Sequence, residues 1–70
     1  MFRYYLLERP AGPGAIPGWM KPTKVCNFPT RTFIPGVGYT WGYVEYDRPL
    51  DPKDEYFYEL RRKVDVRSKV

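Results

Sequence analysis

The sequence has no histidine and only one cysteine, Cys26, among its 70 residues. Without an imidazole, this chain cannot build a Ser-His-Asp or Cys-His nucleophilic site. A structural zinc ion needs several Cys or His ligands, and an internal disulfide needs a second cysteine, so both are excluded. Cys26 itself is interpreted as a small apolar side chain rather than a nucleophile. We therefore predict no cofactor, no metal and no enzymatic activity.

Long apolar runs are also missing. A helix that spans a membrane needs about 18 consecutive apolar residues, and no stretch of this sequence is that long. We therefore expect no membrane partner. Residues 1–9 are too charged and too short to hold the apolar region of a signal peptide. A single cysteine fits a reducing compartment, and the sequence therefore predicts a cytoplasmic protein.

Aromatic side chains, by contrast, are plentiful. The chain has 2 Trp, 7 Tyr and 4 Phe, and 12 basic against 8 acidic residues give a net charge of +4. That charge is too small for a dedicated DNA-binding protein. A domain of this size buries only about 60% of its unfolded surface, so its core cannot hide every ring. We expect some rings to lie exposed together, as a partner surface or as the contact of a homo-oligomer.

Residue patterns predict an α+β fold: one domain over residues 1–70 with a small antiparallel sheet of about four strands and one helix. The expected strands are 2–8, 23–27, 31–35 and 40–47, and the expected helix lies near 52–60. Pro29 is assigned to a turn that joins the second and third strands as a hairpin. Residues 64–70 are expected to form a further strand or a mobile basic tail.

The helix has a clear start, because Asp51 can cap it and Pro52 suits its first position. Phe57 and Leu60 are expected to face the sheet. In the strand at 40–47, alternation predicts Trp41, Tyr43 and Glu45 on one face, with Thr40, Gly42, Val44 and Tyr46 on the other. Gly42 leaves room for a neighbouring ring or backbone to approach closely.

The Pro-Gly-rich segment 9–22 reads as a long loop, and Ile16, Trp19 and Met20 are predicted to hold it on the core. Glu45 and Asp47 lie two positions apart and resemble an acid–base pair, but we interpret them as an exposed strand end.

Cations concentrate near the C-terminus, where residues 61–70 hold five basic residues and one acid. We predict that Arg48, Arg61 and Arg62 contact a partner, with Tyr39, Trp41 and Tyr43 as aromatic anchors. Arg48 is placed near the helix start, and Arg61 with Arg62 near its end, about 14 Å away at 1.5 Å per residue. The alternatives are a solvated face that complements the helix dipole, and rings that belong to the core.

Two stretches carry a resemblance to known sequences. The first runs from Tyr4-Tyr5-Leu6 through Arg9-Pro10 and Pro13-Gly14 to Pro17, and the second from Arg31-Thr32-Phe33-Ile34-Pro35 through Trp41-Gly42 to Glu45-Tyr46-Asp47-Arg48. They resemble short uncharacterised proteins of gut Firmicutes and their phages and mobile elements. The likeness covers about residues 2–60 and ends before the basic tail. It implies a mobile-element setting, in which short proteins often bind and block host immune systems.

Three functions remain open. The first is a non-enzymatic inhibitor of host defence, which occludes a host protein or sequesters a phosphate-bearing small molecule such as a signal nucleotide. The second is a weak single-stranded nucleic-acid binder, whose affinity would fall steeply with salt. The third is a ribonuclease of the RelE type, which works with Tyr, Arg and Lys; the chain lacks the two N-terminal helices of that fold.

Overall fold

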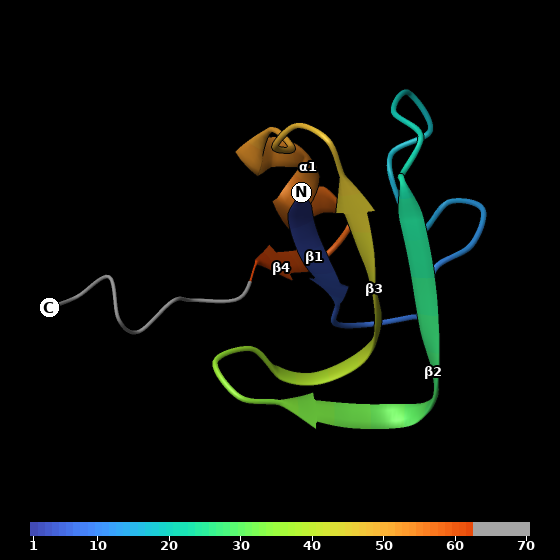
Figure 1. Ribbon diagram of the computed structural model, residues 1–70, viewed down its shortest axis with the longest axis vertical. Coiled ribbons are helices and arrows are strands. Elements are labelled where there is room, and N and C mark those ends of the chain that lie inside the picture. Colours follow the sequence, from blue (N-terminus) through green and yellow to red (C-terminus); the bar gives the residue numbers. More distant parts are fainter. Residues whose placement is uncertain (63–70) are drawn as a thin grey trace, which may run out of the picture.

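The computed structural model describes residues 1–62, and they form a four-stranded antiparallel sheet with one short helix, which confirms the predicted α+β class. The elements in chain order are β1 (Phe2–Leu6), β2 (Lys24–Ile34), β3 (Gly38–Tyr46), α1 (Pro52–Phe57) and β4 (Leu60–Arg62). Across the sheet the order is β2-β3-β1-β4 (Figure 1). The predicted tail at 64–70 lies outside the described residues.

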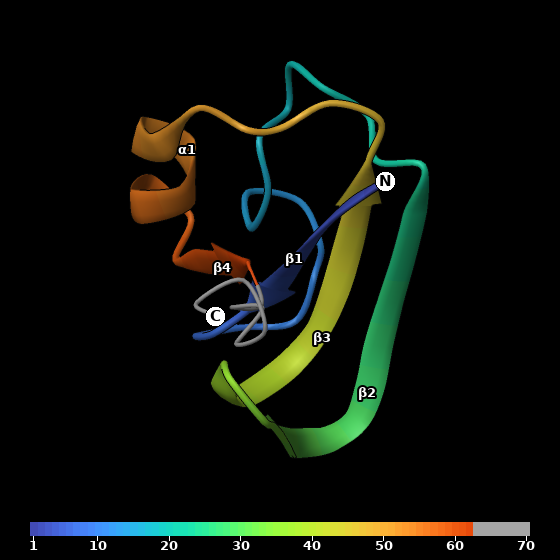
Figure 2. The same cartoon turned by 60° about the vertical axis from the view of Figure 1, so that its left-hand side comes forward.

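The predicted hairpin between residues 23–27 and 31–35 is wrong, because the chain runs through both segments as the single strand β2. Pro29 lies where the register with β3 shifts, between Asn27 opposite Gly42 and Thr32 opposite Thr40. A bulge takes up extra residues by bending the strand, and it tolerates a proline, which has no N–H to donate. β2 and β3 bend together, and the tight turn joins them at residues 35–37 (Figure 2).

Strand β3 follows its predicted alternation. Its even-numbered residues from Thr40 to Tyr46 are buried, whereas Trp41, Tyr43 and Glu45 are half-buried. This pattern arises because successive side chains point to opposite faces, and the face of Val44 and Tyr46 packs on the core more closely than the other. The core cluster joins both ends of the described residues 1–62, and its members are Tyr4, Leu6, Ala15, Val44, Tyr46, Leu50 and Leu60.

The loop between β1 and β2 covers part of the core. Ala15 is buried, and Ile16 and Met20 pack partly against the core as predicted. Asn27 holds the loop, because its Oδ1 accepts a hydrogen bond from the Ala11 N–H at 2.9 Å and its Nδ2 donates to the Ala11 carbonyl at 3.3 Å. The prediction for Trp19 is wrong, since that residue is 62% exposed.

The helix begins as predicted and ends earlier. Asp51 caps it, with its carboxylate accepting a hydrogen bond from the Lys53 N–H at 2.9 Å. The helix stops at Phe57 because Glu59 adopts a left-handed φ of 57° and the chain turns into β4. Leu60 therefore reaches the core from a strand, and Phe57, predicted to face the sheet, is 73% exposed. Within residues 1–62 no helix is long and apolar enough for a membrane span.

The buried hydroxyl of Tyr46 is expected to make the fold less stable at alkaline pH. Burial, and then the negative charge of Asp54, raises the pKa of Tyr46 above its ordinary value of 10.0. As pH rises, the unfolded state ionises first, so the stability present below pH 10.0 is lost above it. We expect the urea midpoint to fall between about pH 9 and about pH 11, and to fall less in Tyr46→Phe. An equal fall in the variant would contradict this cause.

Candidate binding surfaces

Tyr43 lies at the centre of the sheet face that points away from the core. Its ring meets the rings of Tyr5 and Phe28 edge-on, with centroids 5.9 and 6.1 Å apart. The Arg3 guanidinium lies 3.9 Å from the ring centroid, and the Lys24 ammonium lies 5.8 Å from it. Tyr43 is therefore packed among neighbours and presents cations, rather than a bare ring, to solvent.

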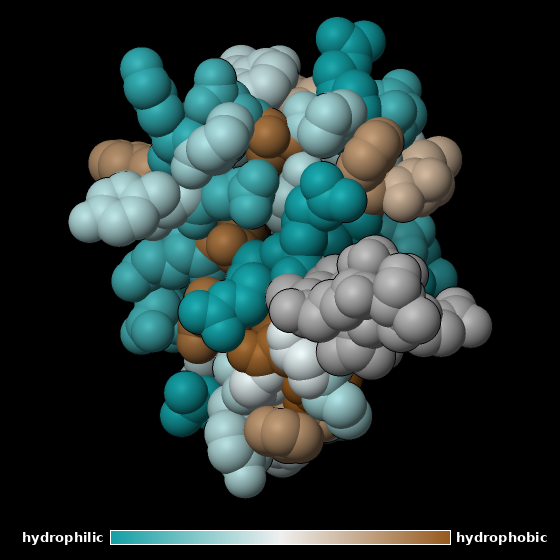
Figure 3. All heavy atoms as spheres, turned by 90° about the vertical axis from the view of Figure 1, so that its left-hand side faces the viewer, coloured by the Kyte–Doolittle hydropathy of each residue, from teal (hydrophilic) through white to brown (hydrophobic). Residues whose placement is uncertain are grey.

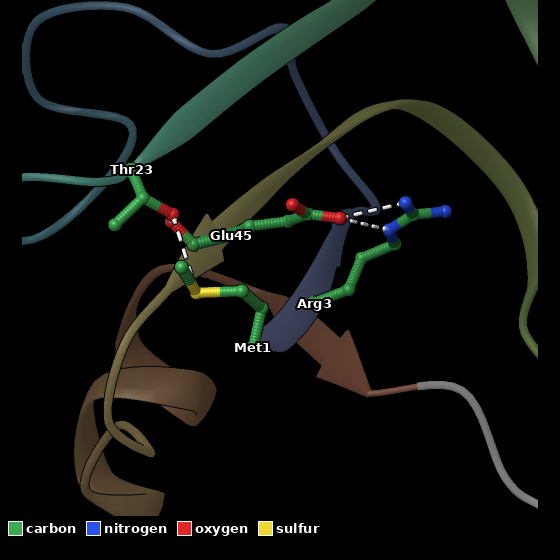
Figure 4. A network of polar contacts seen from close by, with 4 residues as sticks. All are labelled: Met1, Arg3, Thr23 and Glu45. Carbon is green, nitrogen blue, oxygen red and sulfur yellow. Dashed lines mark hydrogen bonds and ion pairs between the residues drawn. The ribbon is translucent and has the colours of Figure 1, made fainter.

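Arg3 and Glu45 form the main polar pair on this face (Figure 4). Nε and Nη2 of Arg3 lie 2.8 and 2.6 Å from the same carboxylate oxygen of Glu45. Hydrogen bonds to Tyr5 and to Glu45 raise the pKa of Arg3 above its usual range. Glu45 is thus engaged across the strands, while Asp47 is exposed and lies 3.8 Å from Arg48. The structure does not join the two carboxylates as an acid–base pair.

A second aromatic cluster lies near the end of the β2–β3 hairpin. Phe33 and Tyr39 face each other across the two strands, with ring centroids 5.3 Å apart. They are 56% and 58% exposed, and the Arg31 guanidinium lies 5.7 Å from the Tyr39 centroid. We call Arg31, Phe33 and Tyr39 the hairpin patch. It confirms that some rings lie exposed together, and it contains one predicted anchor, Tyr39.

Sequence reasoning missed Phe33 and Arg31 because it placed a turn at Pro29. Once β2 is continuous, the register brings Phe33 opposite Tyr39. The available signal was the alternation of Arg31, Phe33 and their neighbours on the far side of the proline.

Charge is divided unevenly along the chain. Residues 9–44, which include the long loop and β2, contain four cations and no Asp or Glu. Residues 45–59, which include α1, contain six acids and two cations. Arg9 is paired with Glu59 at 2.8 Å, whereas Lys21, Lys24 and Arg31 make no ion pair within residues 1–62. Within residues 1–62, two of these three cations thus lie on β2, and Lys21 lies in the loop just before it.

A hollow of about 600 Å³ lies between α1 and the neighbouring strand ends. On this side of the molecule hydrophobic residues lie recessed between hydrophilic ones (Figure 3). Tyr56 and Phe57 at its edge are 89% and 73% exposed. We call this the helix groove, and its lining is Leu7, Glu8, Glu55, Tyr56, Phe57, Glu59, Leu60 and Arg61.

The structure separates the three predicted arginines. Arg48 is exposed and lines a small hollow with Trp19 and Lys21. Arg61 and Arg62 belong to β4, because α1 stops at Phe57, and Arg61 still lines the helix groove beside the helix end. The helix has no basic residue in its last turn, so the dipole explanation is wrong.

The arginines of β4 already have contacts in the fold. Arg61 Nη1 donates a hydrogen bond to the Val37 carbonyl at 2.9 Å, and the Arg62 guanidinium lies 5.3 Å from the Phe2 ring centroid. Trp41, another predicted anchor, is half-buried and packs against the core cluster. Tyr39 is the predicted anchor with the most open surroundings.

Comparison with known families gives the chain a biological setting. The family model described as Defence against restriction A C-terminal matches residues 1–65. The chain belongs to this family. No curated protein and no solved structure matches it. The Defence against restriction A C-terminal family is named for action against restriction, which fits the expected phage or mobile-element setting and an anti-defence role. The link to gut Firmicutes stays a prediction.

Proposed function

We propose that this chain is a non-enzymatic binding protein that opposes restriction by occluding a host restriction protein. Membership of the Defence against restriction A C-terminal family supports the process. The observation that carries the binding mode is the helix groove, where exposed aromatic rings stand among carboxylates. Restriction acts on DNA, and protein surfaces that hold DNA are cationic. An acidic, aromatic groove complements such a surface in charge.

The composition of the groove suits a protein contact. Tyr56 and Phe57 are exposed aromatic side chains of the kind that dominates interface energetics. Glu8 and Glu55 add carboxylates on the same hollow. Such charges select a cationic partner and orient its approach more than they add affinity. Residues 51–59 carry four acids against one cation, so this end of the molecule is acidic although the whole chain is basic.

The local backbone fixes the groove. Asp51 caps the helix that carries both rings, and the Leu7 N–H donates a hydrogen bond to the Glu59 carbonyl at 3.2 Å. Glu59 is the one non-glycine residue with positive φ within residues 1–62. Strained backbone of this kind persists where the surrounding structure over-determines it, and it is common at functional sites. A pre-formed groove binds with little ordering cost.

The proposal predicts which variants lose the ability to protect phage DNA from restriction. Cells that restrict unmodified phage DNA should plate that phage more efficiently when they express the chain. Phe57→Ser combined with Tyr56→Ser should abolish most of the effect, since an aromatic anchor contributes about 2 kcal/mol, or about 30-fold in affinity. Phe33→Ser combined with Tyr39→Ser, which removes two other exposed rings from the hairpin patch, should retain it. Full protection by the helix variant would show that the contact lies elsewhere.

A titration tests whether the action is non-enzymatic. Purified chain is added to the restriction enzyme of a host in which it protects phage DNA, and DNA cleavage is followed. Occlusion should reach its end point near a one-to-one ratio, because each bound molecule blocks one site. Complete inhibition by a small catalytic fraction of the chain would contradict occlusion.

A further inference from the structure

Residues 9–44, which contain no Asp or Glu, support an activity that is independent of the helix groove. We infer that the hairpin patch, together with Lys21 and Lys24, binds single-stranded DNA. Lys24, Arg31 and Phe33 lie on β2, an edge strand of the sheet, while Lys21 precedes that strand and Tyr39 lies opposite Phe33 on β3. The outer edge of β2 pairs with no other strand within residues 1–62.

The aromatic pair supplies the stacking element. Phe33 and Tyr39 keep more than half of their surface accessible, and they hold each other edge-on from two hydrogen-bonded strands. Such rings stack on unpaired bases of any sequence, because every base has a π-face. The bases of a duplex already stack on one another, so the patch favours a single strand.

The cations supply the backbone contacts. Lys21, Lys24 and Arg31 have no ion-pair partner within residues 1–62. Glu45 lies opposite Lys24 in the register, but its carboxylate is bound by Arg3, and Asp47 shares a hollow with Lys21 and Arg48. Arg31 also lies beside the Tyr39 ring, so one guanidinium can reach the phosphate of a nucleotide that stacks there. An acidic protein segment would satisfy the cations but would leave the exposed rings without stacking partners. We choose DNA because the family opposes restriction, which acts on DNA.

The experiment measures binding of a fluorescent oligothymidine of about 12 nucleotides, a length within the usual site sizes, by anisotropy. Three phosphate contacts predict a slope of about −2 for log affinity against log salt, so affinity should fall about 20-fold between about 50 and 200 mM salt. A blunt duplex should bind more weakly at each salt concentration. Absence of binding at low salt, or equal binding of the duplex, would overturn the inference.

Paired variants separate stacking from charge. Phe33→Ser with Tyr39→Ser should weaken binding about tenfold or more at every salt concentration. Lys24→Gln with Arg31→Gln should instead flatten the salt slope to about −0.7, because two of three phosphate contacts are lost. The controls are Tyr56→Ser with Phe57→Ser for the rings and Lys53→Gln for the charge, and both should bind like the parent chain. Equal losses in the controls would overturn the assignment to this surface.

Two further arms make the result specific. RNA of matching sequence should bind no more tightly than DNA, and clearly tighter RNA binding would overturn the choice of ligand. Circular dichroism checks that each variant keeps the parent fold; if the serine pair fails this check, Phe33→Leu with Tyr39→Leu replaces it. Loss of DNA binding with phage protection intact would leave the proposed function standing. Failure of protection with DNA binding intact would overturn the proposed function and not this inference.

Discussion

Replacing Gly42 with alanine is expected to lower the free energy of unfolding by about 3–5 kcal/mol, enough to unfold a domain of this size. Gly42 has a φ of 150°, a value that residues with a Cβ rarely adopt. An added Cβ would lie 2.9 Å from the Asn27 Cα and would overlap the Cys26 carbonyl oxygen. Both obstructing atoms are backbone, so neither can rotate away.

The position of Gly42 makes this clash costly. It pairs with Leu6 on β1 and with Asn27 on β2, so a local shift disturbs both neighbours of the central strand. Urea unfolding followed by circular dichroism measures the loss. Gly18→Ala is the matched control, because nothing lies within 4 Å of its added Cβ and its φ is not positive. Equal stability of the two variants would contradict the prediction.

Loss of the hydroxyl is expected to change the free energy of unfolding differently at two buried tyrosines. Tyr4 accepts a hydrogen bond from the Leu50 N–H at 2.8 Å, and both residues are buried. Tyr4→Phe leaves that N–H without a partner and should cost about 1–3 kcal/mol. The Tyr46 hydroxyl is buried with no partner within residues 1–62. Tyr46→Phe should therefore leave stability unchanged or raise it by about 1 kcal/mol.

The comparison is well matched because the two rings touch. Their centroids lie 6.1 Å apart in an edge arrangement, and both belong to the core cluster. Denaturant unfolding near neutral pH gives both free energies under one set of conditions. A larger loss in Tyr46→Phe than in Tyr4→Phe would show that the hydrogen bond to Leu50 contributes less than inferred.

Local signals in the sequence were sufficient where a local cause decides the structure. Asp51 and Pro52 start the helix because a cap and a fixed φ act within one turn. The alternation over residues 40–47 gave the two faces of β3, since the pleat imposes a period of two. The need for a glycine at position 42 followed from the same strand.

The same signals misled where a long-range contact decides. Pro29 is typical of a turn, yet pairing with β3 carries the chain through it as a bulge. The spacing of Phe57 and Leu60 suits a helix, yet the pairing of Leu60 with Leu6 ends the helix and adds a strand. Strand pairing outweighs local preference here because it satisfies the backbone hydrogen bonds of β2 along its register and because it buries Leu60 of β4 against Leu6.

The candidate surfaces divide in the same way. By itself the sequence determined which chemical groups are present. It has no histidine for catalysis, it has more aromatic rings than a small core can bury, and it has no Asp or Glu in residues 9–44. Only the tertiary structure decided which of these residues meet. It placed Phe33 opposite Tyr39, engaged Arg61 with the Val37 carbonyl, and left Tyr56 and Phe57 on the groove. The sequence specifies which residue types are present, whereas the strand register and the bend at the bulge determine which of these residues lie close to one another.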